Sequence, residues 1–173
     1  QQRGYAKYGD IARLFGWQAL KKFFKQENLD FNAGILTCFE SPICRDGLAQ
    51  VDSRILRLSK AAGADLTPLI HFWGVHPDNS TALAQAITAA GLSSSTIVRD
   101  KLVYYAGIAP INNAQFNTHF ETVFPGRPSN CASPHYGCGW YNVWTDKFNE
   151  SHGSQITTRM QSLLSQYFPG TNL

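Results

Sequence analysis

The sequence has no run of about 18 consecutive apolar residues, the length that a membrane-spanning helix needs. It also carries little charge, with 12 acidic and 15 basic residues among 173, and the basic residues are scattered along the chain. Proteins that bind nucleic acids through phosphates need basic residues gathered in a stripe. We therefore expect no membrane span and no nucleic-acid partner.

The first residues, Gln1 to Tyr5, contain neither a Met nor the apolar core of a secretory signal peptide. This start is typical of a chain that has been cut from a precursor or from a larger protein. The missing signal therefore does not argue against secretion.

Several catalytic and binding motifs are also absent. The sequence has no His-Glu-x-x-His zinc motif, no Gly-x-Ser-x-Gly elbow, no phosphate-binding or dinucleotide glycine motif and no EF-hand. Cys131 and His135 are close enough to suggest a thiol nucleophile. Cys138 is the better partner for that cysteine, however. The sequence therefore predicts no complete catalytic site.

The four cysteines fall into two close pairs, Cys38 with Cys44 and Cys131 with Cys138. Three pairings are possible, and pairing the near neighbours closes two short loops rich in Pro, Ser and Gly. A zinc site is the alternative, but structural zinc prefers cysteines two to four residues apart, and neither pair fits. We favour two disulfides, which predict a secreted, extracellular protein or a periplasmic, surface-exposed one.

Helical periodicity dominates the chain, and signals for strands are weak. Apolar residues recur at helical spacing in the segments 10–28, 46–62, 66–72, 80–90, 95–109, 111–124, 140–148 and 156–167. Asp10, Asp65 and either Asn79 or Ser80 are predicted helix caps, and Gly63 is a predicted helix end. These patterns predict a mostly α fold, a multi-helix bundle or array with long disulfide-closed loops.

The turn around residues 76–79 divides the chain into a helical segment, 1–76, and a C-terminal helical domain, 77–173. A short strand at 34–37 is the best strand candidate.

Candidate binding residues are a histidine and a group of aromatics. His71 and His76 are five residues apart, whereas two ligands on one helix need a spacing of three or four. We therefore interpret His71 as a core or interface residue and keep it as a binding candidate. Four aromatics crowd the loop 136–144, where they can stack on sugars, bind a partner or form the buried face of a helix. They are Tyr136, Trp140, Tyr141 and Trp144.

Two blocks of the sequence resemble the enhancin-like family of secreted zinc metallopeptidases. The first, Leu14–Phe24, resembles the helix that follows the family's zinc-binding core. The second, Arg54–Gly74, resembles the family's next block, in which a helix, a glycine, an Asp-Leu-x-Pro turn and a helix ending in Trp-Gly follow one another. From Pro77 on, the helix pattern is similar to the tail of an immunomodulating metalloprotease of the same family.

The resemblance implies a parent protein of the gluzincin type, which binds zinc with His-Glu-x-x-His and a downstream Glu and cleaves glycosylated, mucin-like proteins. Those ligands are not in this chain, and no motif makes Glu40 a third ligand. The expected function is a non-catalytic helical C-terminal fragment that completes the parent's catalytic domain and helps to position an O-glycosylated protein substrate. Zinc is then the parent's cofactor, and the rest of the parent is the main partner. Gly16-Trp17 and Trp73-Gly74 are expected to be packing residues where helices meet.

Two other functions remain open from the sequence. The chain can be a stand-alone secreted module that binds glycan or protein through the loop 136–144. It can also be a purely structural helical domain without a ligand.

Overall fold

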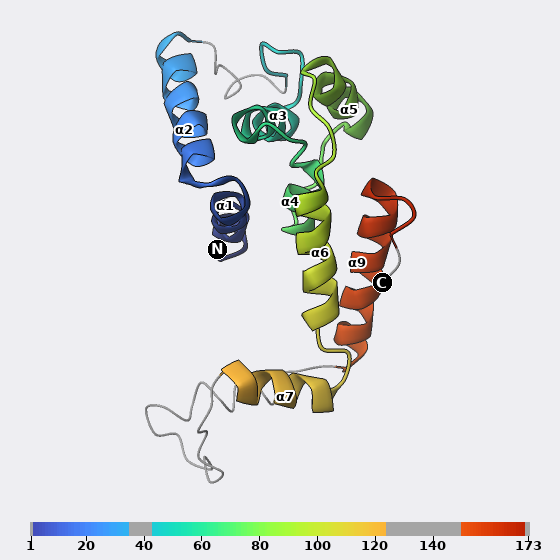
Figure 1. Ribbon diagram of the computed structural model, residues 1–173. Helices are drawn as coiled ribbons and strands as arrows, with labels where there is room; N and C mark the ends of the chain where they lie inside the picture. The colour runs from blue at the N-terminus through green and yellow to red at the C-terminus, as the bar shows by residue number, and fades with distance from the viewer. Residues whose placement is uncertain (1, 35–42, 124–149, 172–173) are drawn as a thin grey trace. The chain divides into compact units, whose positions relative to one another are not determined.

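The computed structural model describes residues 2–34, 43–123 and 150–171. Within these ranges the chain is mostly α-helical, as predicted, and no strand is present. The helices are α1 (Gln2–Phe15), α2 (Trp17–Asn32), α3 (Gln50–Ala62), α4 (Thr67–Phe72), α5 (Ser80–Ala89), α6 (Thr96–Ile108), α7 (Asn113–Val123) and α9 (Glu150–Tyr167) (Figure 1). The strand predicted at 34–37 lies largely outside the described residues. None of the helices in these ranges is long and apolar enough to cross a membrane.

The chain forms two compact units. The first contains Gln1–Leu102 and Leu163–Thr171, and the second contains Val103–Ser162 and Asn172–Leu173. The domain boundary expected after residue 76 falls inside the first unit, and the two-part organisation remains a prediction.

The single helix expected over 10–28 is wrong, because the structure has two helices there. Gly16 separates α1 from α2 with a φ of 79°, a conformation that favours glycine. Asp10 is not a helix cap but lies inside α1, where it is 3% exposed. Its carboxylate accepts a hydrogen bond from the indole Nε1 of Trp73 at 2.9 Å. A partner far away in the sequence therefore holds this carboxylate.

Three other predicted helix boundaries agree with the structure. Gly63 ends α3 in the left-handed conformation, with a φ of 74°. The Asp65 carboxylate accepts the backbone N–H of Thr67 at 2.8 Å at the start of α4. The Asn79 side chain accepts the N–H of Ala82 at 3.0 Å at the start of α5. These local bonds satisfy backbone groups that a helix end leaves without partners.

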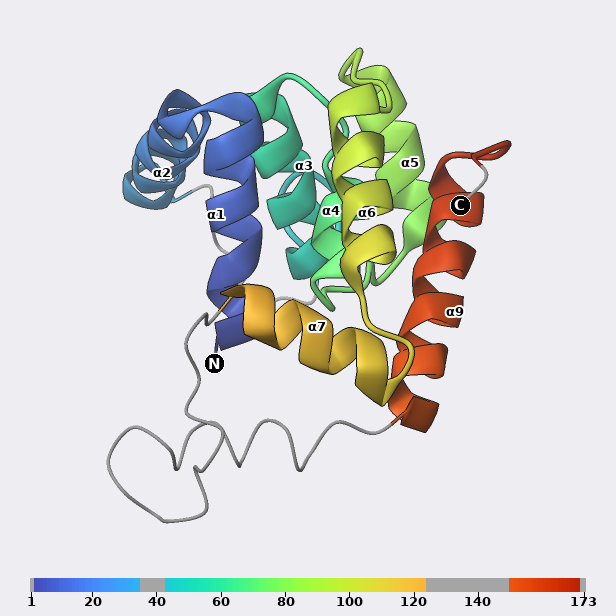
Figure 2. The same ribbon diagram turned by 60° about the horizontal axis from the view of Figure 1, so that its bottom comes forward.

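The core of the first unit is formed by helix packing around α3. Helix α2 packs against α1, beside which it lies in Figure 2, and it also packs against α3. Helix α3 packs in turn against α4 and α5. The most deeply buried apolar side chains come from all of these helices and from α6 and α9. They are Ile11, Phe23, Ile55, Leu58, Leu66, Leu69, Ile70, Leu83, Val98, Leu102 and Leu164. Burial of each such side chain contributes about 1.5–3 kcal/mol to folding.

In the second unit, hydrogen bonds hold the start of α7. The Asn112 side chain accepts the N–H of Gln115 at 2.9 Å, and the Gln115 side chain accepts the N–H of Ile111 at 3.1 Å. The carboxylate of Glu150, the first residue of α9, accepts the N–H of Asn113 at 2.9 Å. A negative charge at a helix N-terminus is favourable. Glu150 thus links α7 to α9.

Candidate functional site

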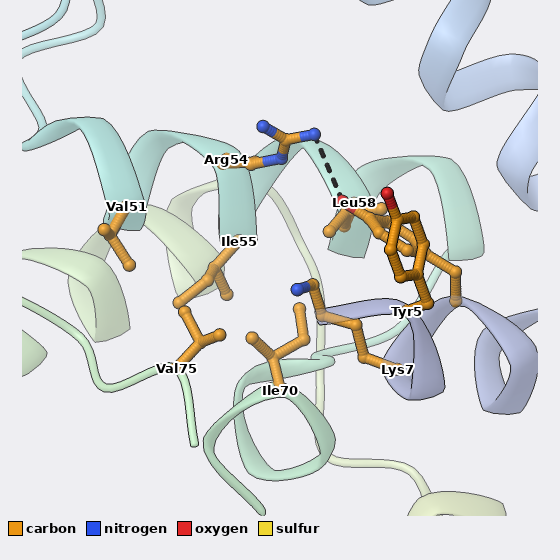
Figure 3. Close-up of a pocket in the computed structure, with 9 residues that line it drawn as sticks. Tyr5, Lys7, Val51, Arg54, Ile55, Leu58, Ile70 and Val75 are labelled. Atoms are coloured by element: carbon orange, nitrogen blue, oxygen red, sulfur yellow. Dashed lines mark hydrogen bonds between the residues drawn. The ribbon is translucent and has the colours of Figure 1, made fainter. Parts of the chain in front are cut away.

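A pocket of about 540 Å³ lies between α1, α3 and the segment from α4 to Val75 in the first unit. This volume is in the range of sites that hold small molecules. Figure 3 shows the Lys7 side chain reaching from α1 into the pocket toward α3. The lining combines aliphatic side chains, Val51, Ile55, Leu58, Ile70 and Val75, with polar ones, Tyr5, Lys7, Tyr8 and Arg54.

Tyr8 places two cations beside each other at this pocket. The ammonium nitrogen of Lys7 lies 5.0 Å from the centre of the Tyr8 ring, a cation–π distance. The Tyr8 hydroxyl accepts a hydrogen bond from Nη2 of Arg54 at 3.1 Å. Because the hydroxyl oxygen accepts from Arg54, its own proton can be donated to a ligand.

The two cations repel each other in this setting. Burial lowers the pKa of Lys7 below its ordinary value of 10.5, and the positive charge of Arg54 lowers it further. Two cationic side chains therefore lie at this pocket, and one of them, Arg54, also contacts a carboxylate on α2.

The acid that pairs with Arg54, Glu27 on α2, is held mainly by another arginine, Arg57. Its Oε1 lies 2.8 Å from Nη2 of Arg57 and accepts a hydrogen bond from Nε of the same side chain at 2.9 Å. Nη2 of Arg54 is 3.8 Å from the other carboxylate oxygen, and the Arg54 side chain is 48% exposed. Arg54 thus lies at the margin of this ion pair and keeps donors that can face a ligand.

A second cluster joins His71 to residues far from it in the sequence. Its Nδ1 is hydrogen-bonded to the Tyr167 hydroxyl at 2.9 Å. Its ring centroid lies 4.4 Å from that of His76. The two histidines meet because α4 ends at Phe72 and Gly74, with a φ of 83°, turns the chain back. A spacing of five residues does not bring two ligands together when both lie on one helix. Gly74 lies between the two histidines, and this glycine is the sequence signal that the helix ends before His76.

The environment shifts the pKa values of two members of this cluster. Burial and then the charge of His76 lower the pKa of His71 below its ordinary value of 6.5. Burial and then the charge of Asp65 raise the pKa of Tyr167 above its ordinary value of 10.0. Among the described residues, no three His, Cys, Asp or Glu side chains form a group that could hold a metal ion.

The lowered pKa of His71 predicts a loss of stability in acid. Between its folded and unfolded pKa values the unfolded chain binds more protons, so stability rises with pH. The contribution of His71 is therefore full above about pH 6.5, its unfolded pKa, and falls as the pH drops through that value toward the lower folded pKa. We expect the urea midpoint of His71→Gln to change less between pH 7.5 and pH 5 than that of the unsubstituted chain. The exposed His152 provides the control His152→Gln, and an equal change in both variants would contradict the prediction.

Neither glycine of the two Trp-Gly pairs lies at a close helix contact, because a Cβ built at Gly16 or at Gly74 has no neighbouring atom within 4 Å. The side chain of Trp73 is partly buried against Asp10, as described above. Trp17 is 69% exposed, so it does not pack between helices of this chain. The turn at Gly16 starts α2 so that Ala19, Leu20 and Phe23 form its buried face, and Trp17 lies outside that face.

Most of the predicted loop residues lie outside the described part of the chain. They are Cys38, Cys131, Cys138, Tyr136, Trp140, Tyr141 and Trp144. Cys44 is described, and it is 7% exposed and disulfide-bonded. A binding function of the loop 136–144 therefore remains a prediction.

The comparisons with known proteins identify no relative: no family model, curated protein or solved structure matches the chain significantly.

Proposed function

We propose that this chain is the non-catalytic, helical C-terminal part of a secreted zinc metallopeptidase that acts on glycoproteins. One observation supports this proposal above the others: the two sequence blocks that resemble the family pack together. Phe23, in the first block, is 1% exposed on α2, which packs against α3. The guanidinium carbon of Arg54, in the second block, lies 5.7 Å from the centre of the Phe23 ring. When two segments of a chain pack into one hydrophobic core, related proteins are expected to contain both segments.

An exposed aromatic face on α2 also supports a larger parent protein. Trp17, Phe24 and Phe31 are 69%, 50% and 61% exposed. They are spaced seven residues apart, close to two helical turns, and so lie along one side of α2. Exposed apolar patches commonly mark interaction surfaces. In the proposed parent, the remainder of the catalytic domain covers this face, and the completed domain positions the glycosylated substrate.

In this proposal, zinc belongs to the parent's own metal site. The described residues provide no group of three ligands, so no step of the peptidase reaction is assigned to them. Their function is to complete the helical core beside the cleft.

The peptidase activity of the purified chain tests this function. We expect no cleavage of an O-glycosylated mucin above the blank, with or without added zinc. Zinc-dependent cleavage that a chelator abolishes would contradict the non-catalytic function.

A secreted protein of this kind is also proposed to have its two loops closed by disulfides, Cys38–Cys44 and Cys131–Cys138. The buried, disulfide-bonded Cys44 supports the first of them. Peptide mapping without reduction is expected to recover these two cross-linked pairs, with no free thiol in the denatured chain. Four free thiols, or zinc bound in proportion to them, would contradict the disulfides and the oxidising location that they imply.

A further inference from the structure

We propose that Asn79 is a glycosylation site, at which an oligosaccharide is attached to the side-chain amide at the start of α5. This inference rests on the secretion proposed above, because the modification takes place in the secretory route of eukaryotic cells. Asn79-Ser80-Thr81 matches the acceptor pattern Asn-x-Ser/Thr, in which x is any residue except proline. Three residues can match by chance, so the exposure and the hydrogen bonds of the acceptor carry the argument.

The acceptor lies on the surface of the first unit. The consecutive residues Asp78–Thr81 are all exposed, where the turn after α4 leads into α5. A glycan is bulky and solvated, so it needs an acceptor side chain that faces solvent. The backbone of the same turn is held from below, since the buried Asp52 accepts the N–H groups of Asp78 and Asn79 at 2.9 and 2.8 Å. A fixed turn therefore carries an exposed acceptor.

The helix cap and the glycan require different atoms of the Asn79 side chain. Its Oδ1 accepts the N–H of Ala82 at 3.0 Å and so caps α5. A glycan is attached through Nδ2, which donates to no other group in the described part of the chain. The amide keeps its carbonyl oxygen after glycosylation. Capping and glycosylation are therefore compatible at this one residue.

The donor of the glycan is an oligosaccharide linked to a lipid pyrophosphate. The bond from Nδ2 to the anomeric carbon of the first sugar forms as the bond from that carbon to the pyrophosphate oxygen breaks. The lipid pyrophosphate leaves with the electron pair, and Nδ2 loses one of its two protons. The Thr81 hydroxyl, two residues further on, completes the pattern that the transferase recognises. Transfer takes place before α5 folds, so the folded chain has only to leave room for the product.

Mass spectrometry of the chain secreted by its native source tests the proposal. Trypsin releases the peptide Ala61–Arg99, in which Asn79 is the single asparagine. We expect this peptide to carry a glycan, and we expect an amidase specific for N-linked glycans to remove it and leave aspartate at position 79. The pattern at residues 149–151 lies in a different peptide, Phe148–Arg159, so a glycan there is recognised separately.

The state of the cysteines separates this inference from the proposed secretion. An unmodified Asn79 in a chain with disulfide-bonded cysteines would overturn the glycosylation site and leave the secreted location in place. An unmodified Asn79 in a chain with four free thiols would overturn both.

Three variants, secreted from eukaryotic cells beside the unsubstituted chain, test the acceptor pattern. Thr81→Ala is expected to abolish the glycan at Asn79, whereas the neighbouring Ser80→Ala keeps the pattern and is expected to keep the glycan. Asn79→Asp removes Nδ2 but retains an oxygen that can accept the N–H of Ala82, so it is expected to lose the glycan and keep the urea midpoint. Equal glycosylation of Thr81→Ala and Ser80→Ala would contradict the site.

Discussion

Replacing Phe23 with alanine is expected to lower the free energy of unfolding of the first unit by about 4 kcal/mol. Phe23 is 1% exposed in the contact between α2 and α3, so its loss removes buried apolar surface and leaves a cavity. It also removes the ring that lies 5.7 Å from the Arg54 guanidinium carbon. Urea unfolding followed by circular dichroism measures the change.

The neighbouring residue provides a matched control for this substitution. Phe24 is 50% exposed, and Phe24→Ala is expected to cost less than about 1 kcal/mol. The two variants remove the same atoms from adjacent positions of one helix. Equal losses of stability would show that α2 does not pack against α3 through Phe23, and would remove the main support for joining the two sequence blocks.

The Asp52→Ala variant is expected to lose about 3 kcal/mol of stability. Asp52 on α3 is fully buried, and its two carboxylate oxygens accept the backbone N–H groups of Asp78 and Asn79 at 2.9 and 2.8 Å. Alanine would leave both donors without this partner at the turn where α5 begins. Urea unfolding again measures the loss, and the start of α5 is expected to exchange amide hydrogens faster.

Asp78→Asn is the control for this prediction. The Asp78 side chain lies in the exposed part of the same turn, and the substitution is expected to change stability by no more than about 0.5 kcal/mol. A similar effect of Asp52→Ala and Asp78→Asn would contradict the assignment of Asp52 as the residue that anchors this turn.

The local features of the fold were predictable from the sequence. Gly63, Asp65 and Asn79 act within a few residues of their own positions, so the residue type and the neighbouring apolar pattern were sufficient. Glycine ends a helix in the left-handed conformation, and short polar side chains accept the first free N–H groups. The mostly helical class followed from the same periodicity.

The features that depend on distant contacts were not predictable in this way. Asp10 has the residue type of a cap, but it is held by Trp73, 63 positions away in the sequence. The pocket cations Lys7 and Arg54 are separated by 47 positions, and no motif connects them. Only the packing of α1 beside α3 brings them to one pocket.

Trp17 shows a different limit of the sequence pattern. A tryptophan beside a glycine is typical of close helix packing, but the direction of α2 after Gly16 decides which face is buried. The aromatic spacing of seven residues on α2 was present in the sequence and would have predicted a shared face. It could not have predicted that this face is exposed.

The central claim, that this chain belongs to a larger zinc metallopeptidase, is tested most directly by the native gene. The measurement is the sequence of the codons that precede Gln1. Our account predicts that they encode a His-Glu-x-x-His helix followed by a glutamate. A secretory signal peptide that ends directly before Gln1 would contradict the claim.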